Sequence, residues 1–196
     1  MLKFNKVLLA SDFDNTLVYT QGALERGEDI PPMSARNREA VEYFMQNGGY
    51  FSISTGRALP AFARYAKDLI AQGKIGRVYH VNMQYFQAWG LPRANCPLVW
   101  RYVKSRTGTG ALGDLGSHAL DLVRFVTNKE YTRVVGHTGT YVHERPLLDG
   151  KGVGKVDVDD FSNYMADMED EISVSFQITR FAYGRGNYQR MEIYGS

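Results

Sequence analysis

The chain has 196 residues, of which 44% are hydrophobic and 22% charged, and its formal net charge is +2. These values are typical of one large soluble domain or two small ones, and the small, evenly spread charge argues against nucleic acid or an anionic membrane as a partner. No apolar stretch approaches the length of a membrane span, and the single cysteine, Cys96, excludes an internal disulfide. We therefore expect a reduced, cytoplasmic setting.

The first 57 residues have the pattern of a strand, a helix and a second strand. "KVLLAS", residues 6–11, is short and apolar on both faces, as is typical of a buried strand in a parallel sheet. Ser34 has the position of a helix N-cap, an apolar stripe at helical spacing follows it, and a pair of glycines ends the helix. "YFSIS", residues 50–54, is the second strand. The pattern predicts a partial Rossmann-like parallel βαβ unit, and the fold class of this part of the chain is therefore α/β.

The rest of the chain has a different order of predicted helices and strands. The spacing predicts helices over 58–72 and 111–127, and strands over 77–89, 131–143, 172–183 and 188–194. This order favours an α+β domain with a mostly antiparallel, open sheet. Unpaired edges of such a sheet would allow a homo-oligomer to form. We place the two domains at residues 1–60 and 70–196.

Two acids follow the first predicted strand. Asp12 and Asp14 are two residues apart, so in extended geometry their side chains point to the same side. Carboxylates at the carboxyl end of a parallel strand lie where doubly wound sheets bind ligands. One carboxylate can attack an electrophile while the other handles a proton, and both can bind a hard cation through oxygen.

These residues carry a resemblance to a known family. "DFDNT", followed by Leu17, resembles the first motif of the haloacid dehalogenase superfamily, and "FSISTGR" resembles the second. The segment between them is similar to the Cof-type sugar-phosphate phosphatases. The resemblance implies that Asp12 is the nucleophile, that Asp14 is the general acid/base, and that both bind Mg²⁺. It also implies that Thr55 and Gly56 bind the phosphate. The later lysine and acidic motifs of the superfamily have no convincing counterpart here.

A second pair of residues indicates a different kind of reaction. Asp114 and His118 are four residues apart in the predicted helix 111–127, which puts both on one helical face. A histidine suits proton transfer because its unperturbed pKa is near neutrality. The alternative is that His118 pairs with Asp114 or Asp121 only to cap the helix.

Three long segments around this pair resemble one family, the glucose–fructose oxidoreductase and inositol dehydrogenase (Gfo/Idh/MocA) family. They are "IAQGKIGRVYHVNMQYFQAW", "WRYVKSRTGTGALGDLGSHALDLVRFV" and "VDVDDFSNYMADMEDEISVSFQITRFAYGRGNYQRMEIYGS". The resemblance implies a sugar- or polyol-binding domain that follows a Rossmann domain holding NAD(P). It makes His118 the acid/base for the substrate hydroxyl and Asp114 the residue that orients the substrate or the imidazole. Asp159 and Asp160 then have a structural role at a strand entry.

Other residues are compatible with such a site. An aromatic set could line a sugar site, or could simply pack a sheet face: Tyr79, Tyr85, Phe86, Trp89 and Trp100. "GTGALG", residues 108–113, has glycines, but it opens the helix of Asp114 and His118 and is a weak match to a dinucleotide-binding loop. The lysine that the family uses in its Rossmann domain has no counterpart here.

Three hypotheses for function follow. The favoured one is weak, Mg²⁺-dependent hydrolysis of a phosphate ester through Asp12, because the nucleophile of that reaction is present. The alternative is a fragment of an NAD(P)-dependent sugar or polyol oxidoreductase that lacks its cofactor domain. The third is a non-catalytic, chimeric scaffold. The expected ligand is a small phosphorylated or sugar-like molecule.

Overall fold

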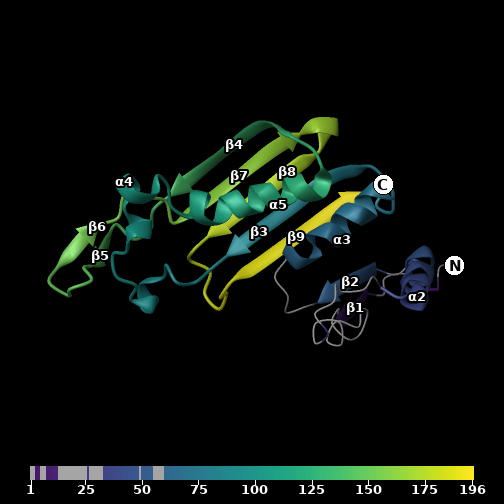
Figure 1. The fold of residues 1–196 in the computed structure, drawn as a ribbon, viewed down its shortest axis with the longest axis horizontal. Helices are drawn as coiled ribbons and strands as arrows, with labels where there is room; N and C mark the ends of the chain where they lie inside the picture. Colours follow the sequence, from purple (N-terminus) through teal and green to yellow (C-terminus); the bar gives the residue numbers. More distant parts are fainter. Residues whose placement is uncertain (1–2, 5–7, 13–25, 27–32, 49, 55–59) are drawn as a thin grey trace. The chain divides into compact units, whose positions relative to one another are not determined.

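The computed structural model divides the chain into two compact units, Met1–Arg57 and Ala58–Ser196 (Figure 1). It describes residues 3–4, 8–12, 26, 33–48, 50–54 and 60–196. Three of the predicted phosphatase residues, Asp14, Thr55 and Gly56, lie outside the described residues.

The first unit contains one pair of strands with a helix between them along the chain. β1 (Leu8–Asp12) and β2 (Tyr50–Ser54) pair in parallel. α2 (Ala35–Gln46) begins after Ser34, whose Oγ accepts a hydrogen bond from the backbone N–H of Asn37 at 3.2 Å. This is the N-cap that the sequence predicts. That the pair belongs to a Rossmann-like core stays a prediction.

The second unit is built on a five-stranded sheet in the order β4-β7-β8-β3-β9. Its strands are β3 (Val78–Phe86), β4 (Tyr131–Gly139), β7 (Phe161–Met168), β8 (Ser173–Thr179) and β9 (Tyr188–Gly195). Three of the four neighbouring pairs are antiparallel, and the pair of β3 and β8 is parallel. The prediction of a mostly antiparallel sheet is therefore confirmed.

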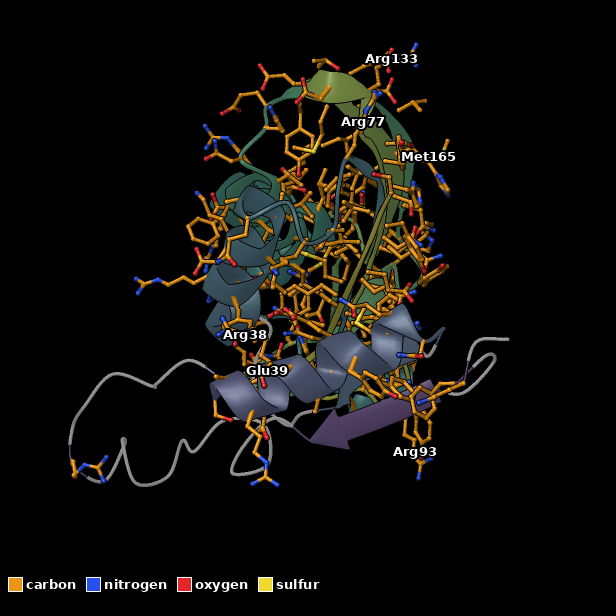
Figure 2. All side chains as sticks on the ribbon, turned by 90° about the vertical axis from the view of Figure 1, so that its right-hand side faces the viewer. Arg38, Glu39, Arg77, Arg93, Arg133 and Met165 are labelled. Atoms are coloured by element: carbon orange, nitrogen blue, oxygen red, sulfur yellow. The ribbon has the colours of Figure 1, made fainter. Side chains whose placement is uncertain are left out.

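Two helices, α3 (Pro60–Ala71) and α5 (Ser117–Thr127), pack against each other, and α5 covers one face of this sheet (Figure 1). Alternate residues of the strands point toward the helices and form the core with α5. Val81 of β3, Phe176 of β8 and Val123 of α5 are at most 1% exposed. Figure 2 shows Met165 on the side of the sheet away from the helices, where it is 60% exposed.

Smaller elements and loops surround one end of the sheet. They are η1 (Pro92–Ala94), η2 (Trp100–Tyr102), α4 (Lys104–Thr107), the π-helical turn η3 (Leu112–Gly116), β5 (Glu144–Pro146) and β6 (Val153–Lys155). At the other end, η4 (Glu169–Glu171) joins β7 to β8. A second, small core cluster of Tyr102, Val156 and Val158 joins the loop of η2 to the segment before β7. Among the described residues, no helix is both long and apolar enough to cross a membrane.

One strand of the sheet is not predicted from periodicity, although the family resemblance implies a strand entry at Asp159 and Asp160. β7 has the alternating burial of a half-buried strand, but its inward side chains include the small residues Ser162 and Ala166, while the apolar Met165 faces outward. The contrast in hydrophobicity between its two faces is therefore weak. Because strand prediction depends on that contrast, the periodicity of the sequence does not reveal β7.

Candidate functional site

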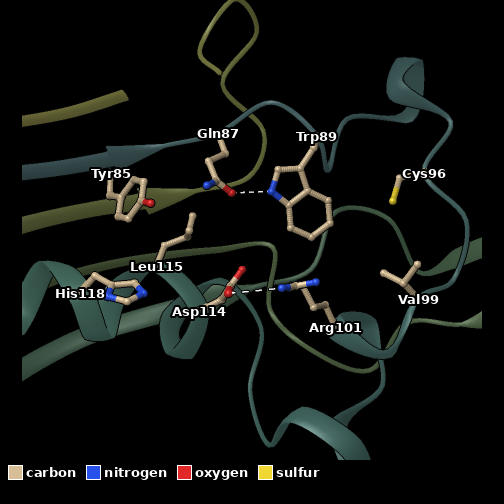
Figure 3. A pocket seen from close by; sticks show the side chains of 9 residues that line it. All are labelled: Tyr85, Gln87, Trp89, Cys96, Val99, Arg101, Asp114, Leu115 and His118. Atoms are coloured by element: carbon tan, nitrogen blue, oxygen red, sulfur yellow. Dashed lines mark hydrogen bonds and ion pairs between the residues drawn. The ribbon is translucent and has the colours of Figure 1, made fainter. Parts of the chain in front are cut away.

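A cavity of about 410 Å³ lies beside the start of α5 (Figure 3). It is lined by residues from the end of β3, from the loop that follows it and from the beginning of the α5 helix: Tyr85, Gln87, Trp89, Cys96, Val99, Arg101, Asp114, Leu115 and His118. The volume is within the usual range of small-molecule sites, roughly 300–1,000 Å³. The predicted pair Asp114 and His118 thus lines one cavity.

The helix that carries this pair is held at its start by a carboxylate from a distant loop. One oxygen of Asp159 accepts hydrogen bonds from the Thr109 hydroxyl at 2.8 Å and the Gly110 N–H at 2.7 Å, and the other accepts from the Leu112 N–H at 2.6 Å. A negative charge is favourable at this end because the N–H groups there have no partner within the helix. Asp159 therefore has the structural role that the sequence suggests.

Gly110 lets the two segments approach this closely. A Cβ atom built on Gly110 would lie 1.9 Å from the backbone oxygen of Asp159, far inside van der Waals contact. The chain then forms the π-helical turn η3 before α5 begins at Ser117. Single π turns within helices are frequent at functional sites. Here the turn contains Asp114 and immediately precedes the turn of His118.

We expect Asp159→Ala to lower the free energy of unfolding by about 2 kcal/mol, because three hydrogen bonds to a charged acceptor are lost at a helix start. Asp121→Ala is the matched control, since Asp121 is an exposed acid of α5. Urea unfolding followed by circular dichroism measures both changes. Equal losses in the two variants would contradict the capping role.

The carboxylate of Asp114 lies between two arginines. Its Oδ2 accepts a hydrogen bond from Nη2 of Arg180 at 2.9 Å, and its Oδ1 lies 3.9 Å from Nε of Arg101. The Arg180 side chain is completely buried, whereas the side chains of Asp114 and Arg101 are 32% and 43% exposed. One side of the carboxylate thus meets a buried cation, and the other meets a cation at the pocket wall.

His118 is exposed at the rim of the same cavity (Figure 3). Its imidazole forms no hydrogen bond with Asp114 or Asp121 within the described part of the chain, and a capping contact is therefore not seen there. An exposed ring nitrogen in a cavity is accessible to a ligand hydroxyl. Its role as acid/base stays a prediction.

Part of the pocket wall is aromatic. Of the predicted aromatic set, Tyr85 and Trp89 line the cavity, whereas Trp100 stacks on Arg101 with 4.4 Å between the guanidinium carbon and the ring centroid. Behind Trp89 lies Tyr102, which is fully buried, with 5.4 Å between the ring centroids. Burial raises the pKa of the Tyr102 hydroxyl, which keeps it protonated at neutral pH.

The sequence did not reveal either arginine beside Asp114. Arg180 follows the apolar strand β8, and an arginine after a strand is usually a solvated residue. Its burial next to Asp114, 66 residues away in sequence, depends on the packing of the whole sheet. The described ranges contain no group of three or more His, Cys, Asp or Glu residues placed to bind a metal ion.

Comparison with known proteins gives one family. The model described as the GFO/IDH/MocA C-terminal domain matches residues 63–196. Levoglucosan dehydrogenase from Pseudarthrobacter phenanthrenivorans is 37% identical over 152 residues, which cover 71% of this chain and 38% of that protein. An uncharacterized oxidoreductase from Synechocystis is 28% identical over 171 residues, or 84% of this chain and 44% of that protein.

Solved structures give the same result. An oxidoreductase domain protein from Kribbella flavida is similar with a TM-score of 0.65 and 39% identity, covering 81% of this chain and 41% of that one. Levoglucosan dehydrogenase in complex with NADH and L-sorbose is similar with a TM-score of 0.62 and 39% identity, covering 67% of this chain and 34% of that one. The chain spans about two fifths of the length of the curated relatives it matches.

These relatives contradict the phosphatase prediction. They are dehydrogenases and oxidoreductases, so the predicted Mg²⁺-dependent hydrolysis through Asp12 and Asp14 is wrong as the main function. The physical reason is that a five-residue motif at a strand end specifies a local arrangement of carboxylates only. Phosphoryl transfer also needs groups from later strands to stabilise the transferred phosphate. In the described structure Asp12 ends β1, as predicted.

Proposed function

This chain belongs to the GFO/IDH/MocA family, and we propose that residues 63–196 are the substrate domain of an NAD(P)-dependent sugar or polyol oxidoreductase. The observation that carries the proposal is the shared cavity of Asp114 and His118 with the aromatic residues Tyr85 and Trp89. Aromatic rings pack against the C–H faces of a sugar, while the acid and the imidazole bind its hydroxyls. Relatives with known ligands support this class of substrate. Levoglucosan dehydrogenase has been solved in complex with NADH and L-sorbose, and with NADH and levoglucosan.

In this proposal His118 takes the proton of the reacting hydroxyl. The O–H bond breaks as its proton moves to an imidazole nitrogen, and the alcohol oxygen becomes a carbonyl oxygen. Asp114 accepts a hydrogen bond from a neighbouring hydroxyl and so orients the substrate. The C–H bond of the carbon that carries the reacting hydroxyl breaks as well, and a nicotinamide, when bound, would accept that hydride.

The glycine-rich loop 108–113 does not fit the dinucleotide itself. Residues 108–113 are glycine-rich, but the N–H groups of Gly110 and Leu112 already donate to Asp159. They are therefore not free to bind a pyrophosphate, which is the task of a dinucleotide-binding loop. This loop would therefore not hold the cofactor. The domain boundaries that we predict from the sequence, 1–60 and 70–196, remain a proposal, and the family model begins slightly earlier, at residue 63.

The two tryptophans allow a direct test of substrate binding. Trp89 lines the cavity, and Trp100 does not. We expect levoglucosan or L-sorbose to shift the NMR signal of the Trp89 indole N–H in the full chain, with a dissociation constant of about 1–10 mM. The Trp100→Phe variant assigns the two signals. We expect His118→Gln to weaken binding about tenfold, because the amide does not place its hydrogen-bonding atoms where the imidazole nitrogens lie.

His137→Gln is the matched control, because His137 lies in β4, where it packs edge-on against Phe161. It should bind the sugar as the wild type does. If neither sugar nor myo-inositol shifts the Trp89 signal at about 100 mM, the ligand class is wrong. If His118→Gln and His137→Gln weaken binding equally, His118 has no role in the site.

A further inference from the structure

Arg180 is a charged residue in a fully buried position. Its side chain is 0% exposed, and it follows the last residue of β8. The guanidinium lies over the ring of Trp89, 4.8 Å from its centroid, and 5.8 Å from that of Tyr102. Within the described part of the chain, its only ion pair is with Asp114. Its Nε and Nη1 atoms are buried without a hydrogen-bond partner there.

The energetics of burial tie this arginine to Asp114. A guanidinium in the interior has lost its hydration, and removal of its counter-ion would leave an uncompensated charge. The nearby aromatic faces attract the cation but do not neutralise it. The ion pair with Asp114 is therefore the main charge compensation that Arg180 has among its described neighbours.

The same pair constrains Asp114. Its Oδ2 accepts a hydrogen bond from Nη2 of Arg180, and the planar guanidinium lies beside the rings of Trp89 and Tyr102. Its Oδ1 is the oxygen nearer Arg101, a residue of the cavity lining. One oxygen of the carboxylate is thus bound to the buried Arg180, and the other lies on the side of Arg101 and the cavity.

We propose that Arg180 is a positioning residue of the substrate site, which fixes the carboxylate of Asp114 so that Oδ1 accepts a hydrogen bond from a substrate hydroxyl. This inference rests on the proposed function. Arg180 itself does not line the cavity. It acts through Asp114, whose Oδ2 accepts its hydrogen bond.

The first test measures sugar affinity in variants of the full chain by the Trp89 NMR signal. We expect Arg180→Met to weaken levoglucosan binding about tenfold, because Asp114 loses its anchor, and Arg180→Lys to weaken it less, because the charge is kept although the planar contact with the rings is lost. We also expect levoglucosan to shift the Nε–H signal of Arg180 in the wild type. Wild-type affinity in Arg180→Met, or equal weakening in Met and Lys variants, would overturn the positioning role.

A second test needs no ligand and stands apart from the proposed function. Asp114→Asn should lower the melting temperature by about 4–8 °C, because Arg180 is left buried without its counter-ion. The double variant Asp114→Asn/Arg180→Met should lose less than the sum of the single losses. Arg180→Gln, which also removes the charge, replaces Arg180→Met in the cycle if the methionine variant does not fold.

The two tests separate the hypotheses. Additive losses in the cycle would overturn the coupling of Arg180 to Asp114, even if the wild type binds sugars well. If the cycle is non-additive and the wild type binds no sugar, the proposed function fails, and the substrate role of Arg180 fails with it.

Discussion

Replacing Phe176 with alanine is expected to lower the free energy of unfolding of the second unit by about 3–5 kcal/mol. Phe176 is 1% exposed in the middle of β8, and its ring stacks on Tyr164 with 4.5 Å between centroids. A second ring, that of Tyr131, lies 6.2 Å away. Alanine would leave a cavity between these large side chains, which cannot close without moving the strands.

Gln177→Ala is the control for this prediction. Gln177 is the next residue of the same strand and is exposed on the other face of the sheet, where it accepts a hydrogen bond from Gln84. Its loss should cost at most about 0.5–1 kcal/mol. Urea unfolding monitored by circular dichroism compares the two variants. A similar loss in both would show that burial at Phe176 does not dominate the stability of the sheet.

Replacing Gly110 with alanine is expected to cost about 3 kcal/mol of unfolding free energy and to weaken sugar binding at least tenfold. The new Cβ would lie 1.9 Å from the backbone oxygen of Asp159, so one of the two segments must move. This cost is at the upper end of the range for overpacking, because the conflict is with backbone rather than a flexible side chain. The shift would carry Asp114 and His118 with it, since their helix starts at this residue.

The control for Gly110 is another glycine with free space around it. A Cβ on Gly186 would meet no atom within 4 Å, and Gly186 is exposed. Gly186→Ala should therefore leave both the unfolding free energy and the Trp89 NMR titration unchanged within error. If Gly110→Ala behaves like Gly186→Ala, the helix start tolerates the shift, and close packing against Asp159 does not set the pocket.

Much of the second unit can be predicted from its sequence. The strand predicted over 172–183 is β8, and its alternation is clear because Val174, Phe176 and Ile178 are all large, apolar and buried. The helical stripe over 111–127 likewise predicts α5. It does not predict the π turn before it, because the start of that turn donates hydrogen bonds to the carboxylate of Asp159, more than 40 residues away.

The candidate site is predictable only in part. The spacing of Asp114 and His118 is local information, and both residues line one cavity. The partners of Asp114 are not local: Arg180 reaches it only after β8 has joined the sheet, and no sequence period encodes that contact. The phosphatase hypothesis failed because it rested on local information alone. A short motif at one strand end predicts less about function than a family match over 134 residues.

The position of β3 in the sheet has a consequence for synthesis on the ribosome. β3 is the first strand of the second unit, but its two neighbours are β8 and β9, the last strands of the described chain. β4, β7 and β8 can pair one after another as they emerge, whereas β3 must wait with Val81 and Met83 unshielded by any strand on either side. The pairing of β3 with β8 and β9 therefore depends on contacts of high sequence separation, which form slowly. Until they form, apolar surface of β3 is exposed to other chains.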